Sequence, residues 1–301
     1  MTRALLITNP AASRTAHDSV AAVVQTLERG GWRVEAHVTG GPGDARRFAE
    51  QAVGDAFDVV TVFGGDGTTM QAAAALVGTG IELGVIPGGT GNLLAGNLRM
   101  PVSPIRAART ILKARTLALD LGRVERTDGL HYYAVACGAG YDARVMAETA
   151  ARHKRRWGMG AYVATTFRLL RELHSARHRI TVDGSVYDVS AALVLVANCA
   201  EVIPPYVRLR RGISPTDGVL DLITLRADSF RDGVRAVWDL LREGDVFDGG
   251  PGHVGYMRGK EIRVESDPPE PFEMDGETHG ATPFSTVVIP GAIRVLAPDS
   301  L

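Results

Sequence analysis

The first third of the chain alternates short apolar runs with stretches of helical character. The predicted strands lie at 5–8, 33–38, 59–63 and 83–86, and the predicted helices lie at 19–28, 45–53 and 71–77. Strands that alternate with helices at this spacing favour a parallel sheet with helices on both faces. Ligands of such sheets bind beyond the carboxyl ends of the strands. We therefore expect the loops after Thr8, Phe63 and Ile86 to converge on one site.

The pattern changes near residue 120, after which short strands are joined mostly by Gly, Asp and Pro turns. This texture is typical of an antiparallel β-domain. We expect an α/β domain at 1–121 and a β-domain at 122–291. The strands of the second domain are predicted at 132–137, 179–182, 186–189, 191–197, 219–225, 261–265 and 286–289, with helices at 161–173 and 230–241.

Composition excludes several classes of protein. Hydrophobic residues make up 45% and charged residues 22% of the 301 positions, as in globular proteins. The 33 Lys and Arg nearly balance the 34 Asp and Glu, so an extended nucleic-acid surface is disfavoured. No stretch approaches the ~18 apolar residues that span a bilayer, and the first apolar run is too short for a signal peptide. Cys137 and Cys199 lie in apolar runs, which favours buried thiols in a reducing, cytoplasmic compartment.

Two glycine loops are the strongest candidates for chemistry. Gly64-Gly65-Asp66-Gly67-Thr68 follows a buried strand and opens a helix, where backbone N–H groups can hold phosphates. A tight turn with Asp66 as a helix cap is the alternative. The second loop, Pro87-Gly88-Gly89-Thr90-Gly91-Asn92, ends the next strand. Two such loops side by side favour a phosphate site over two ordinary turns.

Two familiar nucleotide motifs do not account for these loops. The P-loop pattern G-x-x-x-x-G-K-[ST] is absent from the sequence. Gly138 to Ala143 matches the dinucleotide fingerprint, but it lies in mid-chain with no βαβ unit to follow it. A Rossmann site at this position is therefore disfavoured.

The order of these motifs resembles the diacylglycerol kinase and sphingosine kinase family, which includes bacterial soluble lipid kinases. The matching segments are Asn9-Pro10, 64–68, 87–92, 138–143, 214–221 and 274–277. The resemblance implies an N-terminal domain similar to those of NAD kinases and phosphofructokinases, a C-terminal β-sandwich, and ATP in the cleft. It also implies that residues 292–301 return to the first domain.

Carried over position by position, the resemblance implies a nucleotide site. Its residues are Asn9, Pro10, Ala11, Ala12, Ser13, Thr39, Gly64, Gly65, Asp66, Gly67, Thr68, Thr69, Met70, Gln71, Gly89, Thr90 and Asn92. The chain departs from the family at Met70-Gln71, where Asn-Glu is frequent. A contact from that carboxylate to the nucleotide sugar is therefore not expected here.

The resemblance implies a Mg²⁺ site and a general base in the second domain. The Mg²⁺ ligands would be Asp217 and the carbonyls of Ser214 and Val219, with support from Asp221. Asp217-Gly218 taken alone predicts only a turn. Glu277 would be the base, although a hairpin glutamate is usually just solvated. Asp66 is the alternative base, or else the ligand of a second, ATP-bound Mg²⁺.

The predicted function is transfer of the ATP γ-phosphate to a lipid hydroxyl. The candidate acceptors are diacylglycerol, a sphingoid base or another lipid alcohol. The basic run at 152–157 predicts either a solvated helix face or transient contact with anionic lipid at the inner membrane surface. A homodimer is compatible with the resemblance. A NAD kinase and a non-catalytic lipid- or nucleotide-binding regulator are the alternative functions.

Overall fold

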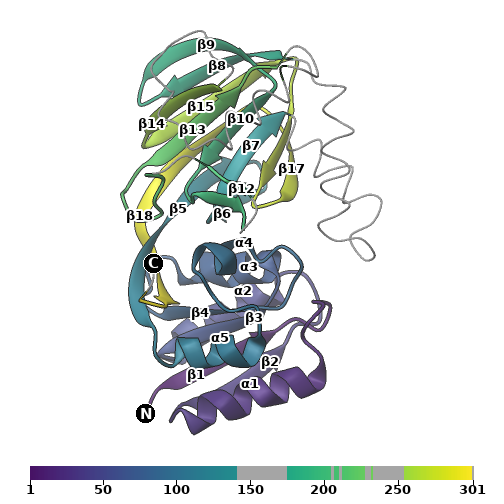
Figure 1. Cartoon of the computed structure of the whole chain (residues 1–301), viewed down its shortest axis with the longest axis vertical. Helices are drawn as coiled ribbons and strands as arrows, with labels where there is room; N and C mark the ends of the chain where they lie inside the picture. Colours follow the sequence, from purple (N-terminus) through teal and green to yellow (C-terminus); the bar gives the residue numbers. More distant parts are fainter. Residues whose placement is uncertain (141–174, 205–206, 210–211, 228–231, 233–253, 300–301) are drawn as a thin grey trace. The chain divides into compact units, whose positions relative to one another are not determined.

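The computed structural model of the chain describes residues 1–140, 175–204, 207–209, 212–227, 232 and 254–299 (Figure 1). The chain forms two compact units. The first consists of Met1–Asp120, Ile203–Pro205 and Pro290–Leu301, and the second of Leu121–Val202 and Tyr206–Ile289. The long strands β5 (Arg115–Arg126) and β18 (Phe284–Ala297) carry the chain from one unit into the other.

The first unit is built on a parallel sheet. Its strands are β1 (Arg3–Thr8), β2 (Arg33–Val38), β3 (Val59–Gly64) and β4 (Glu82–Pro87), in the order β2-β1-β3-β4. The last part of β18 adds a further parallel strand beside β4, with Arg294 opposite Glu82. Strands β1, β3 and β4 are almost wholly buried, which explains their continuous apolar sequences.

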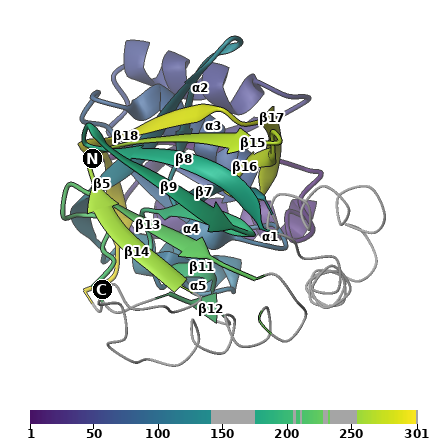
Figure 2. The ribbon, with the colours of Figure 1, turned by 90° about the horizontal axis from the view of Figure 1, so that it is seen from above.

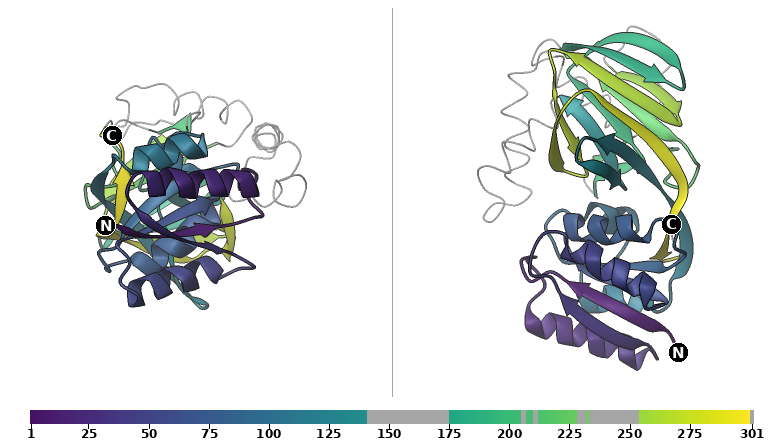
Figure 3. Two further views of the ribbon diagram at one scale, coloured as in Figure 1. Left: turned by 90° about the horizontal axis from the view of Figure 1, so that it is seen from below. Right: turned by 180° about the vertical axis from the view of Figure 1, so that it is seen from behind.

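Helices cover both faces of this sheet, as the alternating pattern predicts. They are α1 (His17–Arg29), α2 (Asp44–Gly54), α3 (Asp66–Leu76), α4 (Leu93–Asn97) and α5 (Pro104–Ile111). Helix α1 contacts α5 on one face, and α2 contacts α3 on the other (Figure 3). Helix α2 buries Ala45, Phe48, Ala49 and Ala52 along one stripe, as expected for a helix with one covered face.

The second unit is an antiparallel β-sandwich (Figure 2), which confirms the predicted fold class. One sheet contains β8 (Ala176–Val182), β9 (Ser185–Ala191), β15 (Glu261–Asp267) and the first part of β18, with β5 and β6 (Gly129–Tyr133) alongside. The other has the order β14-β13-β10-β7-β16-β17. Its strands are β7 (Ala136–Gly140), β10 (Leu193–Ala197), β13 (Leu220–Leu225), β14 (Val254–Gly259), β16 (Pro271–Met274) and β17 (Glu277–Ala281). Two short strands, β11 (Glu201–Ile203) and β12 (Val207–Arg208), pair separately.

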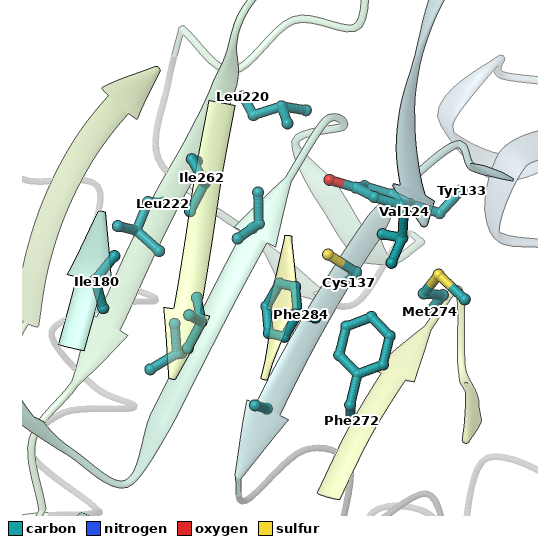
Figure 4. Packing of buried hydrophobic residues seen from close by; sticks show 14 of the residues in the cluster. Val124, Tyr133, Cys137, Ile180, Leu220, Leu222, Ile262, Phe272, Met274 and Phe284 are labelled. Carbon is teal, nitrogen blue, oxygen red and sulfur yellow. The ribbon is translucent and has the colours of Figure 1, made fainter. Parts of the chain in front are cut away.

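The core of the sandwich lies between its two sheets (Figure 4). Phe272 and Phe284 stack with ring centroids 4.3 Å apart, and Ile180, Ile262 and Leu222 extend the cluster. Cys137 lies in this core, and both cysteines are buried and free. Burial raises the pKa of each thiol, so both stay protonated and unreactive near neutral pH.

The predicted strand at 132–137 is divided in the structure. Residues 132–137 form the end of β6 and the start of β7, with a break at Ala134 and Val135. Both residues donate backbone hydrogen bonds to the carboxylate of Asp275, which takes the place of a neighbouring strand. The predicted helices at 161–173 and 230–241 lie outside the described residues.

No helix in the part of the chain that the structure describes is long and apolar enough to cross a bilayer.

Candidate active-site elements

The structure brings together the loops that follow β1, β3 and β4. The side-chain amide Nδ2 of Asn9 donates a hydrogen bond to Oγ1 of Thr68 at 2.8 Å, and the backbone N–H of Asn9 donates to the carbonyl of Phe63 at 3.2 Å. Oδ1 of Asn9 accepts from the N–H of Ala11 at 2.9 Å. One asparagine therefore shapes the first loop and fastens it to the glycine loop after β3.

Asp66 holds the glycine loop after β4. Its Oδ2 accepts a hydrogen bond from the N–H of Asn92 at 2.7 Å, and its Oδ1 accepts from the N–H of Leu93 at 2.6 Å. Burial raises the pKa of Asp66, and these two hydrogen bonds act in the opposite direction. The carboxylate thus braces the two glycine loops against each other. Its implied roles as base or metal ligand stay predictions.

The two glycine loops pack backbone against backbone. A Cβ atom added to Gly89 would lie 2.8 Å from Cα of Gly65, and one added to Gly91 would lie 2.7 Å from Oδ2 of Asp66. Asn92 closes the second loop, since its side chain accepts from the N–H of Gly89 at 2.9 Å and donates to its carbonyl at 2.7 Å. Only glycine fits at Gly89 without displacing the neighbouring backbone.

Arg14 is a loop residue that the sequence interpretation missed. Its guanidinium Nη1 donates to the carbonyl of Gly89 at 2.8 Å, and its backbone N–H donates to the carbonyl of Gly88 at 3.0 Å. The only signal in the sequence is its position directly after the predicted run 9–13. Arg14 completes the set of contacts between the first and third loops.

Thr39 and Gln71 each take part in one hydrogen bond that joins separate segments of the first unit. The N–H of the buried Thr39 donates to the carbonyl of Thr8 at 2.8 Å. The amide oxygen Oε1 of Gln71 accepts from the N–H of Gly43 at 3.1 Å. The neutral amide at position 71 therefore joins α3 to the loop before α2 without adding a negative charge.

The predicted Mg²⁺ loop of the second unit is organised around Asp217. Its Oδ1 accepts from the N–H of Val219 at 3.3 Å, and its Oδ2 pairs with the guanidinium of Arg258. Oγ of Ser214 hydrogen-bonds Oγ1 of Thr216 at 3.0 Å. Among the described residues, no group of three or more His, Cys, Asp and Glu side chains could hold a metal ion.

A second carboxylate near this loop still makes the residues fit a hard cation. Asp221 is completely buried, and its Oδ2 has no hydrogen-bond partner among the described residues. Its Oδ1 accepts from the hydroxyl of Tyr256 and pairs with Nε of Arg258 at 3.0 Å. Burial raises the pKa of Asp221. Mg²⁺ accepts few protein carboxylates together with carbonyls and waters, so the donor set is suitable.

Glu277 is presented by a tight hairpin turn between β16 and β17. Asp275 and Gly276 form the turn with φ of 45° and 82°, as two-residue hairpin turns require. The carboxylate of Asp275 accepts three backbone hydrogen bonds, from Ala134, Val135 and Ala136, at 2.7 to 3.0 Å. Glu277 itself is exposed at the first position of β17. A rigid turn therefore carries a solvent-accessible carboxylate.

Two histidines lie close to this hairpin. The rings of His131 and His279 meet edge to face with centroids 5.3 Å apart, and Nε2 of His131 hydrogen-bonds Asp128 at 2.9 Å. Burial lowers the pKa of His279, and the neighbouring His131 lowers it further. His279 is therefore neutral near pH 7 and shares one face of β17 with Glu277.

The strand register places Asp221 and Glu277 at the same end of one sheet, on different strands. Asp221 pairs with Ala197, Ala197 with Ala136, and Met274 with both Cys137 and Glu277. The order β13-β10-β7-β16-β17 leaves four strand intervals between them, or about 19 Å along the sheet. The structure thus does not bring the predicted metal loop next to the predicted base.

The Gly-rich match to the dinucleotide fingerprint has a packing explanation. A Cβ added to Gly138 would lie 2.9 Å from the carbonyl oxygen of Val194, and one added to Gly140 would lie 2.5 Å from that of Ala192. These glycines let β7 pair closely with β10. Tyr141 to Ala143 lie outside the described residues, as does the basic run at 152–157.

The chain combines a parallel α/β unit that has two braced glycine loops with an antiparallel sandwich, and family models match both parts. Residues 3–124 match the family model of the diacylglycerol kinase catalytic domain, and residues 135–297 match that of the YegS C-terminal NAD kinase beta sandwich-like domain. The chain therefore belongs to the diacylglycerol kinase-like family.

Two individual relatives show how far the similarity extends. A diacylglycerol kinase of Staphylococcus aureus is 25% identical over 277 residues, which cover 91% of this chain and 85% of the enzyme. An uncharacterized protein of Synechocystis is 28% identical over 213 residues, but these span 70% of this chain and only 48% of that protein.

Solved structures share the fold. The crystal structure of a putative diacylglycerol kinase from Bacillus anthracis has a TM-score of 0.82 at 23% identity. The match covers 99% of this chain and 98% of the chain in that structure. Another solved structure, of a putative diacylglycerol kinase from the same organism, has a TM-score of 0.78 at 24% identity and covers 98% of this chain and 97% of that structure's chain.

Proposed function

We propose that the protein is an ATP- and Mg²⁺-dependent kinase that transfers the γ-phosphate of ATP to the hydroxyl group of a lipid, with diacylglycerol as the first candidate. The observation that carries the proposal is the pair of glycine loops braced by Asp66 and Asn92 at the carboxyl edge of a parallel sheet. The S. aureus relative named a diacylglycerol kinase supports the choice of acceptor.

The first unit would bind ATP through the three converged loops. The glycine loops at 64–67 and 88–91 would present backbone N–H groups to the phosphates, and Asp66 begins helix α3 next to them. Because the loops are already fastened by Asn9, Arg14 and Asp66, binding requires little ordering of the protein. ATP is therefore expected to bind a largely preformed site.

The second unit would provide the base and the cation site. Asp217 and the carbonyls of Ser214 and Val219 would hold a Mg²⁺ ion, which supplies positive charge close to the acidic edge of the sandwich. Since Asp221 lies about 19 Å from Glu277 along the sheet, we assign this cation a structural role in the sandwich.

Glu277 would accept the proton of the lipid hydroxyl. As the proton moves to the carboxylate, the hydroxyl oxygen bonds to the γ-phosphorus, and the bond from that phosphorus to the β,γ-bridging oxygen breaks to release ADP. The exposed position of Glu277 on a rigid turn suits this role because an acceptor can approach it. Asp66, whose oxygens hold the loop at 92–93, is the less accessible alternative.

The substrate implies where the protein would act. A lipid alcohol lies in a membrane, so we place the protein in the cytoplasm with transient contact to the inner membrane surface. A homodimer belongs to the same proposal by resemblance alone.

The proposal is tested by incubating the protein with γ-labelled ATP, Mg²⁺ and a panel of lipid alcohols in mixed micelles, with NAD as a further acceptor. The wild type is compared with Glu277→Gln and with the control Glu261→Gln, an exposed glutamate at the start of β15. We expect one labelled lipid whose formation depends on Glu277 and not on Glu261. Label in NADP would indicate a NAD kinase. Bound ATP without transfer to any acceptor would indicate a regulator.

A further inference from the structure

Strands β13 and β14 carry an acidic pair that shares one arginine. Asp221 of β13 is completely buried and lies opposite Arg258 of β14 in the register, while Asp217 lies in the loop that leads into β13. Tyr256, two residues before Arg258 on the same face of β14, donates its hydroxyl to Asp221. Two carboxylates and one guanidinium leave this cluster with a net charge of −1.

The two contacts of Arg258 differ in environment. Its Nε pairs with the buried Oδ1 of Asp221 at 3.0 Å, and its Nη2 pairs with Oδ2 of Asp217, whose side chain is 30% exposed. The first contact is shielded from water, whereas the second is partly solvated and therefore weaker. The contact of Arg258 with Asp221 is therefore the firmer of the two.

Asp217 is also the one carboxylate of the proposed Mg²⁺ site. A divalent cation and a guanidinium cannot share the same carboxylate oxygen without strong repulsion between their charges. The buried Oδ2 of Asp221, which has no hydrogen-bond partner among the residues described, marks unsatisfied negative charge beside the arginine. The cluster therefore has room for more positive charge, but Arg258 already occupies the outer carboxylate.

We propose that Arg258 is a built-in competitor of the divalent cation at Asp217. In the cation-free protein its Nη2 neutralises Asp217. Cation binding displaces Nη2 from Asp217, while Nε stays on Asp221. This inference rests on the proposed Mg²⁺ site and adds a residue that sets its affinity.

Competition from Arg258 would change the affinity of the site for Mg²⁺. Without Arg258, the loop at 214–219 would carry an uncompensated carboxylate in the absence of cation. With it, the loop keeps one conformation at low Mg²⁺, and the cation must exchange with a protein group. The affinity for Mg²⁺ is then lower than the ligands alone would give, so the site fills over a higher range of Mg²⁺ concentration.

The test measures cation binding to the nucleotide-free full chain. Mg²⁺ is titrated calorimetrically and Mn²⁺ by electron paramagnetic resonance, for wild type, Arg258→Gln and the control Arg263→Gln. Glutamine keeps a neutral donor for Asp221, and Arg263 pairs with Glu265 on an exposed part of β15. We expect Arg258→Gln to bind either cation about fivefold more tightly and Arg263→Gln to match the wild type.

A second measurement does not depend on any variant. The Nε–Hε resonance of Arg258 is followed in the wild-type protein during a Mg²⁺ titration, and we expect it to shift in step with cation binding while the resonance of Arg263 stays in place. Unchanged or weaker cation binding in Arg258→Gln, or a stationary Arg258 resonance, would overturn the proposal. A wild type that binds no cation would overturn it too, whereas lipid phosphorylation in the same preparation would leave the kinase assignment intact.

Discussion

The candidate sites of the two units are built in different ways. In the first, the candidate site is made of backbone, since glycine loops approach within van der Waals contact and side chains such as Asn9 and Asp66 only fasten them. In the second, strand pairing forms the frame, Asp275 fastens the hairpin through backbone hydrogen bonds, and the proposed chemistry rests on the single carboxylates Glu277 and Asp217. Replacing a side chain should therefore affect turnover in the second unit and ATP binding in the first.

The largest expected effect comes from the proposed base. Glu277→Gln should lower the rate of lipid phosphorylation by about 10² to 10⁴-fold, the usual contribution of a general base. Its stability should stay within about 0.5 kcal/mol of the wild type because Glu277 is exposed. Steady-state kinetics and urea unfolding of the same preparations check both statements. Turnover equal to that of the wild type would remove Glu277 from the mechanism.

The next effect concerns the support of the hairpin. Asp275→Asn should destabilise the second unit by about 2 to 4 kcal/mol, because three backbone N–H groups would then face a neutral amide that accepts fewer hydrogen bonds. The matched control is Asp188→Asn, which removes an exposed ion pair with Arg179 and should cost less than about 0.5 kcal/mol. Urea unfolding measures both, and equal effects would contradict the assigned role of Asp275.

A smaller effect is expected in the glycine loops. Gly89→Ala should destabilise the protein by about 1 to 3 kcal/mol and weaken ATP binding, since its Cβ would lie 2.8 Å from the backbone of Gly65. Gly41→Ala is the control because no atom lies within 4 Å of the added Cβ. Thermal unfolding and ATP titration are the measurements. A Gly89→Ala protein that behaves like the control would show that the loops do not need close contact.

The smallest effect is a pH dependence in the sandwich. His178 is buried, its Nε2 donates to the carbonyl of Ala191 at 3.0 Å, and its Nδ1 accepts from Ser266 at 2.9 Å. Burial lowers the pKa of His178, so the unfolded chain binds more protons between that lowered pKa and about 6.5. Stability is therefore complete above pH 6.5 and falls as the pH drops below it.

The histidine prediction has a direct check. Urea unfolding at pH 7.5 and pH 5.5 should show a loss of up to about 1.4 kcal/mol for the wild type from this one group. His178→Gln should lose less on acidification, while His17→Gln, which changes a fully exposed histidine, should follow the wild type. An identical loss in His178→Gln would assign the pH dependence to other groups.

The sequence predicted the first unit more completely than the second. The runs at 5–8, 59–63 and 83–86 are buried strands in a parallel sheet because an apolar run of this length has few other stable environments. Helices α4 and α5 were missed, since α4 spans only Leu93–Asn97 and follows the glycine loop directly. The short helix exists because Asp66, distant in sequence, accepts from its first N–H groups.

In the second unit, several features depend on contacts between residues far apart in the sequence, which the local pattern of residues does not predict. The break between β6 and β7 depends on Asp275, about 140 positions further along the chain. The pairing of Arg258 with Asp217 and Asp221 depends on the register of β13 and β14, which no local spacing encodes. The acidic turns were found through the family resemblance, whereas Asp217-Gly218 alone predicted only a turn.

The most direct test of the division between the two units is the dissociation constant of ATP for Glu277→Gln and Asp66→Asn, measured side by side with the wild type. We predict that Glu277→Gln binds ATP within about twofold of the wild type. Asp66→Asn, which turns an amide toward the N–H groups of Asn92 and Leu93, should weaken binding by about tenfold or more. Weakened binding in Glu277→Gln together with unchanged binding in Asp66→Asn would contradict this division of roles between the two units.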